Sequence, residues 1–414
     1  MPSVDRRAFL GGALGAAGLA AAGGAGFGIA RADDDSRSNS SGAAAVPFYG
    51  PHQAGIATPA QDRLAFAAFD VTNPDPTALQ SLLATWAAAA AQMTKGAPVG
   101  PVETAPQAPP VDTGEAMGLA ASQLTITVGF GPSLFDERFG LAKYKPAALA
   151  KLPALPGDYL QADISDGDLC VQACANDPQV AFHAVRNFAR LARGTAVMRW
   201  SQLGFGRTSS TSTAQATPRN LLGFKDGTNN IKSEDGSELD DYVWVGAETD
   251  QPWMRGGSYL VSRRIRMLIE SWDTDYLADQ ENVFGRFKVS GAPLTGKHEF
   301  DPVDLNARKP DGTPVIPLNA HIRLASHVTN NGIRILRRGY SYTDGIDQDT
   351  GLLDAGLFFI VFCKDAHKQF VPIQRRLGQH DNLNEYIRHT SSALFAVPPG
   401  LRGAGDYYGK VLFT

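Results

Sequence analysis

The segment from Asn220 to Asn230 carries a carboxylate between two glycines. It reads Asn-Leu-Leu-Gly-Phe-Lys-Asp-Gly-Thr-Asn-Asn, so Asp226 lies between Gly223 and Gly227. The glycines allow the backbone to approach a flat ligand closely, and few neighbouring side chains could screen the carboxylate. A carboxylate in an apolar niche can act as a general base. The alternative is an ordinary Asp-Gly turn with Asn and Thr capping groups.

The chain has only eight histidines, so there are few candidates for a histidine metal ligand. His321, in Asn-Ala-His-Ile-Arg-Leu-Ala-Ser-His, is a candidate iron ligand. His327 in the same segment and His52 in Tyr-Gly-Pro-His-Gln compete with it. A lone histidine is more often a satisfied structural group, so the residues alone leave this choice open. The remaining histidines lie in patterns typical of helix faces or loops: His183, His298, His367, His380 and His389.

Arg337 and Arg338 are adjacent in a predicted strand. Strand alternation sends their side chains to opposite faces, so one of the two guanidinium groups could point into a pocket. The alternative is a pair of surface cations at a strand end, which is the common position of arginine.

Apolar and alternating segments predict a β-α-β-β-α-β order in the first half of the chain. Asp75-Pro76 and Asp177-Pro178 each supply an N-cap and a first-turn proline for a helix. Strands are predicted at 64–71, 124–130, 169–173 and 196–203. This order is the ferredoxin-like motif.

The second half is predicted to repeat the motif. Its expected strands cover 258–268, 333–342, 357–362 and 410–413, and its helices cover 273–284 and 367–377. The predicted fold class is therefore α+β, with two ferredoxin-like halves, 47–219 and 220–414, that share one core. Pro- and Gly-rich stretches at 98–113 and 292–311 are expected to be long surface loops, which often border a functional site.

The first 32 residues are predicted to be an export signal. Arg6-Arg7 precedes a Gly/Ala-rich run that ends in Ala30-Arg31-Ala32, a small-x-small cleavage pattern. The twin-arginine route carries folded proteins, which suits a chain that takes up a cofactor before crossing. Residues 33–46, rich in Asp, Ser and Ala, are predicted to be a disordered linker.

Charge and cysteine content exclude some classes of protein. The formal net charge is −4, which argues against a nucleic-acid partner. Three cysteines give neither a disulfide framework nor a zinc knuckle. No Cys-x-x-Cys-His occurs, so covalent attachment of a c-type haem is excluded.

Several of these motifs together resemble the dye-decolourising (DyP-type) peroxidase family, and within it the exported, EfeB-like deferrochelatase/peroxidase branch. The matching segments are 223–227, 321–325 and 336–340, in that order behind a twin-arginine signal. Segments 48–56, 253–259 and 290–294 also match, so the resemblance covers nearly all of the mature chain.

The resemblance implies one haem b per chain, bound without covalent attachment between sheet and helices, mainly by the C-terminal half. By motif position His321 would be the proximal iron ligand, Asp226 the distal acid/base and Arg337 the distal arginine. Asp365 is the candidate acid that orients His321 from behind. Further haem contacts are implied at Gly227, Thr228, Asn229, Arg286, Ser326, His327 and Val328.

The implied activity is reduction of hydrogen peroxide through a ferryl intermediate, with oxidation of dyes, phenols or other small aromatic one-electron donors. Because a bulky dye could not reach a buried haem, electrons could pass through Tyr340, Tyr342, Tyr386 or a tryptophan near the surface. Implied partners are the twin-arginine (Tat) export machinery and a membrane partner for iron uptake. The expected location is the periplasm, the extracellular space or the outer side of the cell envelope.

Three alternatives stay open at this point. One is an exported haem-handling protein that releases iron from haem, and another is a non-catalytic haem carrier, which would have little use for Asp226 and Arg337 together. The third is a binding module with a ferredoxin-like core and no cofactor.

Overall fold

The computed structural model describes residues 45–414. The predicted export signal and the predicted linker up to residue 44 lie outside the described residues, so export stays a prediction. Among residues 45–414, no helix is both long enough and apolar enough to cross a membrane.

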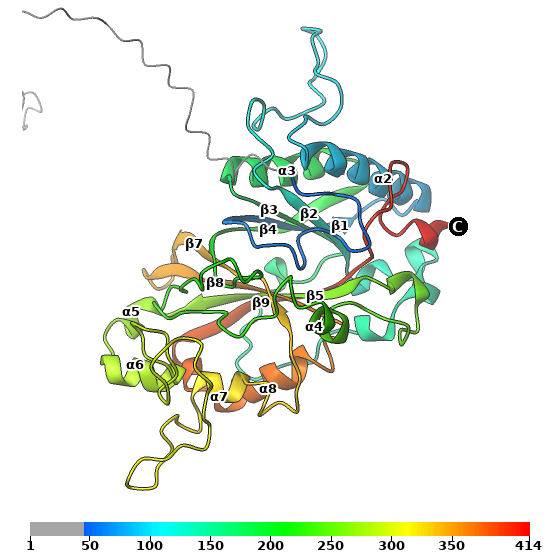
Figure 1. The fold of residues 1–414 in the computed structure, drawn as a ribbon. Coiled ribbons are helices and arrows are strands. Elements are labelled where there is room, and N and C mark those ends of the chain that lie inside the picture. The colour runs from blue at the N-terminus through cyan, green and yellow to red at the C-terminus, as the bar shows by residue number, and fades with distance from the viewer. Residues whose placement is uncertain (1–44) are drawn as a thin grey trace, which may run out of the picture. The chain divides into compact units, whose positions relative to one another are not determined.

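The N-terminal half has the predicted element order (Figure 1). Both helices begin at the positions that the Asp-Pro pairs predicted, because the aspartate of each pair caps its helix. The Asp75 side chain accepts from the Thr77 N–H, and the Asp177 side chain accepts from the Gln179 and Val180 N–H groups. The elements are β1 (Arg63–Val71), α2 (Pro76–Met93), β2 (Thr125–Phe130), β3 (Leu169–Ala175), α3 (Pro178–Leu191) and β4 (Ala196–Arg207).

The C-terminal half follows after α4 (Gly236–Tyr242). Its strands are β5 (Ser258–Met267), β6 (Leu336–Arg337), β7 (Tyr340–Ile346), β8 (Leu353–Cys363) and β9 (Ile387–Val397). Its helices are α5 (Ile269–Trp272), α6 (Leu277–Phe284), α7 (His321–Ala325) and α8 (Phe370–His380). Short 3₁₀ turns occupy Pro132–Leu134, Glu137–Phe139, Ala142–Tyr144, Ala147–Leu149, Ala162–Ile164, Pro252–Met254, Asn382–Glu385 and Lys410–Phe413.

Three predicted elements of this half are corrected. Residues 410–413 form a 3₁₀ turn, and the last strand is β9. Strand β9 was not predicted because its first part, Arg388 to Ser392, is polar and lacks the apolar pattern of a buried strand. Most of these residues are nevertheless buried. The helix predicted at 273–284 begins only at Leu277, as α6, and the separate short helix α5 precedes the predicted range. The strand predicted at 333–342 is interrupted between β6 and β7.

The two sheets have the same strand order and join into a closed ring. The N-terminal sheet runs β2-β3-β1-β4 and the C-terminal sheet runs β9-β5-β8-β7. Phe130 of β2 pairs with Ala396 of β9, and Phe205 of β4 pairs with Ser341 of β7. This pairing closes the sheet edges on both sides. The expected pair of ferredoxin-like halves is confirmed.

Strand alternation divides the apolar residues between two faces. On β1, Phe66 faces the other sheet and packs with Phe358 and Phe395 of the C-terminal half, so the two halves share one core as expected. Helices α2 and α3 cover the outer face of the N-terminal sheet, and α6, α7 and α8 cover that of the C-terminal sheet (Figure 1). An aromatic cluster of Phe224, Trp272, Phe284 and Tyr386 lies beneath the helices of the C-terminal half.

His389 on β9 is expected to make stability depend on pH. Burial, together with the Arg263 charge, lowers the pKa of this residue to about 3. An unfolded histidine titrates near 6.5, so only the unfolded chain takes up this proton as the pH falls from about 6.5 toward 3. The free energy of unfolding should therefore lose about 2–3 kcal/mol from this residue between pH 7 and pH 4.5.

Urea unfolding at several pH values checks this expectation. The His389→Gln variant should show a shallower fall in stability over that range than the wild type. His380→Gln, which changes an exposed histidine, should keep the wild-type pH dependence. Equal pH dependence in the wild type and His389→Gln would contradict the prediction.

Candidate active site

Asp226 and Arg337 form an ion pair, with 2.9 Å between Asp226 Oδ1 and an Arg337 terminal nitrogen. The other carboxylate oxygen, Oδ2, accepts from the Asn220 amide at 3.2 Å. The Asp226 side chain is 14% exposed and that of Arg337 24%. Each carboxylate oxygen is therefore held by a side chain, in a position that small molecules can still reach.

The loop that carries Asp226 is built on its own polar groups and glycines. The Asn220 side-chain oxygen accepts from the Leu222 and Phe224 N–H groups, and the Asp226 N–H donates to the Pro218 carbonyl. Gly227 has φ +89°, and a Cβ there would lie 2.9 Å from the backbone of Ser209. Glycine is therefore required at this position.

Arg337 is positioned through its backbone. The side-chain oxygen of Asn230 accepts from the Arg337 N–H, and the side-chain amide donates to the Arg337 carbonyl, both at 2.8 Å. Arg338 points the other way, is fully buried and donates to Thr58 and Gln61 of the N-terminal half. The predicted divergence of the two arginines is confirmed. Asn230 was not among the predicted site residues, because its role depends on the fold.

His321 is the first residue of α7, and its ring is oriented by a buried carboxylate. Nδ1 lies 2.6 Å from Oδ2 of Asp381, whose side chain is 2% exposed. Burial lowers the pKa of His321, but the charge and hydrogen bond of Asp381 raise it more, and the net shift is upward. The Asp226 and Arg337 charges also act on this pKa, in opposite directions, so the three groups are within electrostatic reach of one another.

The prediction that Asp365 orients His321 is wrong. Asp365 precedes α8 and accepts from the His367 and Lys368 N–H groups. Asp381 follows the same helix and meets His321. The helix separates the two aspartates by about 16 Å along its axis, so only one of them can lie behind the imidazole. A capping pattern marked Asp381 in the sequence, since its side chain also accepts from the Leu383 N–H, but nothing there linked it to His321.

The two competing histidines differ from His321 in their surroundings. His52 stacks on Trp244 with 3.8 Å between ring centroids, and its Nδ1 lies 2.7 Å from the Gly256 carbonyl oxygen. These contacts are those of a structural histidine. His327 follows α7, and its Nδ1 is buried with no hydrogen-bond partner among residues 45–414.

The other predicted contact residues gather around two segments. Ser326, His327 and Val328 follow the helix of His321 directly. The Thr228 hydroxyl lies 3.1 Å from a side-chain oxygen of Glu299, whose backbone carbonyl accepts from Arg286. One group of predicted contact residues therefore follows the helix that begins at His321, and the other includes residues that follow Asp226 in the chain.

The predicted relay tyrosines are buried. Tyr340 and Tyr342 are fully enclosed between the sheets, and the Tyr386 hydroxyl bonds Asp275. None of the three tyrosines therefore lies at the surface, and an electron-transfer role for any of them stays a prediction. Tyr386 packs edge-on against Trp272, at 4.9 Å between ring centroids.

The fold and this site belong to a known class: the chain is a member of the DyP-type peroxidase family. The family model for the N-terminal part of DyP-type peroxidases matches residues 53–206, and the model for the C-terminal part matches residues 217–402.

Individual relatives cover most of the chain. Deferrochelatase of Escherichia coli strain K12 is 41% identical over 371 residues, which is 88% of this chain and 86% of that protein. A DyP-type peroxidase from Streptomyces coelicolor superposes with a TM-score of 0.83 at 40% identity, covering 90% of this chain and 98% of the other. Ferric DtpA from Streptomyces lividans has a TM-score of 0.83 at 40% identity, covering 91% and 99%.

Proposed function

We propose that this protein is a haem b peroxidase that reduces hydrogen peroxide and oxidises dyes, phenols or other small one-electron donors. The observation that carries the proposal is the ion pair of Asp226 with Arg337, within electrostatic reach of a histidine oriented by Asp381. A base, a fixed positive charge and a metal ligand are the groups that peroxide activation requires. The ferric and oxyferrous forms of the related DtpA support an iron cofactor.

The residues present fit one non-covalent haem b. Asp381 engages Nδ1 of His321, which leaves Nε2 as the nitrogen for iron, and a carboxylate behind a ligating histidine increases its basicity. We propose that Gly227 to Asn229 and Ser326 to Val328 flank the haem. Arg286, which is 8% exposed, is the proposed partner of a haem carboxylate. The bound iron supplies the site for peroxide and the electron transfer.

Asp226 would transfer the proton and Arg337 would stabilise the developing charge. The carboxylate would take a proton from one oxygen of hydrogen peroxide and return it to the other oxygen, which leaves as water. This cleavage consumes two electrons, which would come from the bound haem. The Arg337 guanidinium group would stabilise the negative charge that develops as the O–O bond breaks. Asn220 and Asn230 hold the two groups in register, so little reorganisation is needed during the reaction.

Peroxide-dependent oxidation of a phenol by the haem-loaded protein tests the proposal. We expect turnover that saturates with peroxide and is at least about 10²-fold faster than that of free haem at the same concentration and pH. A protein that binds haem with a normal Soret band, but neither reacts with peroxide nor oxidises the donor, would exclude the peroxidase function.

A second candidate function is release of iron from intact haem. Its support is the 41% identity to a relative named deferrochelatase. This activity would leave metal-free protoporphyrin, whose fluorescence distinguishes it from peroxidase turnover. A protein that shows neither porphyrin fluorescence nor turnover, yet retains haem, would be a carrier.

A further inference from the structure

The Glu299 carboxylate binds the segment that carries Asp226, residues 220–230, which we call the Asp226 loop. One carboxylate oxygen accepts from the Lys225 ammonium group, and the other lies 3.1 Å from the Thr228 hydroxyl. Lys225 directly precedes Asp226 in the chain, and Thr228 follows it by two residues. A single carboxylate from a distant segment therefore holds the loop on both sides of Asp226.

Glu299 is buried and ionised. Its side chain is 9% exposed. Burial raises the pKa of Glu299, but hydrogen bonds from Lys225, Thr217 and Thr228 lower it more, and the net shift is downward. Removing one member of a buried ion pair leaves the other charge uncompensated, so the contact between Lys225 and Glu299 is costly to break.

The segment that carries Glu299 is itself fixed. Arg286 donates to the Gly291 carbonyl at 2.7 Å and to the Glu299 carbonyl at 3.1 Å. Gly291 has φ +74°, and a Cβ there would lie 2.7 Å from the Lys225 side chain. Glycine at this position therefore leaves room for the lysine stem beside the segment, which can act as a firm support for the loop.

The Asp226 loop depends on such contacts for its position. Residues 220–230 belong to no helix and to no strand of the two sheets. The Asp226 N–H donates to the Pro218 carbonyl, which belongs to the same segment of chain. Contacts within one segment do not fix its place relative to Arg337, so side chains from other segments must do so.

We propose that Glu299 is a positioning residue, which acts through Lys225 and Thr228 to keep the Asp226 carboxylate against Arg337. Its effect on peroxide chemistry rests on the proposed peroxidase function. Its effect on the order of the Asp226 loop does not, and is measured separately.

Hydrogen–deuterium exchange of the purified protein, followed by mass spectrometry, measures the order of the loop. We expect amides of residues 220–230 to exchange at least about tenfold faster in Glu299→Gln and in Lys225→Met than in the wild type. The double variant Lys225→Met/Glu299→Gln should exchange no faster than the faster single variant, because both changes remove the same interaction. Peptides from β1 and β3 should keep wild-type exchange.

The kinetic test uses the haem-loaded protein. Glu299→Gln should react with hydrogen peroxide about 10–100-fold more slowly than the wild type, because a displaced carboxylate is poorly aligned for proton transfer. Its rate constant with the phenol donor should stay at the wild-type value, since that step does not use Asp226. A general disturbance of the site would lower both rate constants.

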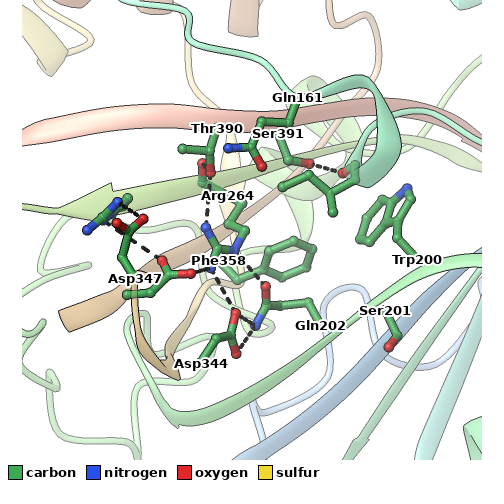
Figure 2. A pocket seen from close by; sticks show the side chains of 13 residues that line it. Gln161, Trp200, Ser201, Gln202, Arg264, Asp344, Asp347, Phe358, Thr390 and Ser391 are labelled. Atoms are coloured by element: carbon green, nitrogen blue, oxygen red, sulfur yellow. Dashed lines mark hydrogen bonds and ion pairs between the residues drawn. The ribbon is translucent and has the colours of Figure 1, made fainter. Parts of the chain in front are cut away.

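Asp344→Asn is the matched control, because it also breaks an ion pair between distant segments. Asp344 pairs with Arg264 at 2.8 Å, and both line a cavity toward the end of β7, away from Arg337 (Figure 2). This variant should keep wild-type exchange in the Asp226 loop and both wild-type rate constants.

Several results would overturn the positioning role. They are wild-type exchange of residues 220–230 in Glu299→Gln, additive effects of Glu299→Gln and Lys225→Met, equal effects in Asp344→Asn, and an unchanged reaction of Glu299→Gln with peroxide. A wild type that binds haem but does not react with peroxide would instead exclude the peroxidase function, and the exchange data alone would then decide whether Glu299 holds the loop.

Discussion

The Asp226→Asn variant of the haem-loaded protein is expected to react with hydrogen peroxide about 10²–10⁴ times more slowly than the wild type. Asparagine at this position can still accept the hydrogen bond from the Asn220 side-chain amide. It cannot take up the peroxide proton, and it removes the negative charge that pairs with Arg337. The measurement is the change of the Soret band after stopped-flow mixing with one equivalent of peroxide. Haem content should match the wild type, because Asp226 is not the proposed iron ligand.

Asp240→Asn is the matched control for this experiment. Asp240 lies exposed on α4, and its change removes the same charge from the surface. It should react at the wild-type rate. Equal rates for Asp226→Asn and Asp240→Asn, with haem bound in both, would show that Asp226 is not the acid/base, even if the protein turns over peroxide.

The His321→Ala variant is expected to lose most of its haem, because no other side chain is proposed to ligate the iron. Asp381→Asn should keep the ligand but bind haem about 10–100-fold more weakly, since it loses the charge that orients and polarises the imidazole. Haem titration followed at the Soret band measures both effects. The same titration at increasing concentrations of free imidazole should partly restore haem binding to His321→Ala.

Asp365→Asn separates this explanation from a general effect of charge. Asp365 lies at the other end of α8, where its side chain accepts from the His367 and Lys368 N–H groups and pairs with the Lys368 ammonium group. Its haem affinity should therefore equal that of the wild type. If Asp365→Asn weakened haem binding as much as Asp381→Asn, the hydrogen bond to His321 would not be the cause.

The N-terminal half was predictable almost element by element. Its two helices begin at Asp-Pro pairs, which act through local hydrogen bonds and a fixed proline φ angle. Strands β1, β2 and β3 are buried on both faces, one against the helices and one against the other sheet, whereas β4 alternates between buried and exposed residues along part of its length. Local sequence features were therefore sufficient to predict the helices and strands of the N-terminal half.

Strand β9 was not predictable in this way. Its first residues, among them His389, Thr390 and Ser391, are polar and buried, and Thr390 contacts Arg264 of the neighbouring strand. Their burial depends on partners that come from distant segments, so periodicity gives no signal. Segment 410–413 shows the opposite error: its largely apolar residues predicted a strand, but they form a 3₁₀ turn beside α2.

The sequence by itself determined the class of the protein, the three principal site residues as candidates, and the divergence of Arg337 from Arg338. These follow from motif order and from strand alternation, which are properties of short segments. Only the tertiary structure decided that Asp381, and not Asp365, stands behind His321, and that Asn220 and Asn230 hold Asp226 and Arg337. The physical reason is that a hydrogen bond depends on ångström-scale geometry between segments, which the packing of α7 against α8 and of β6 against β8 sets.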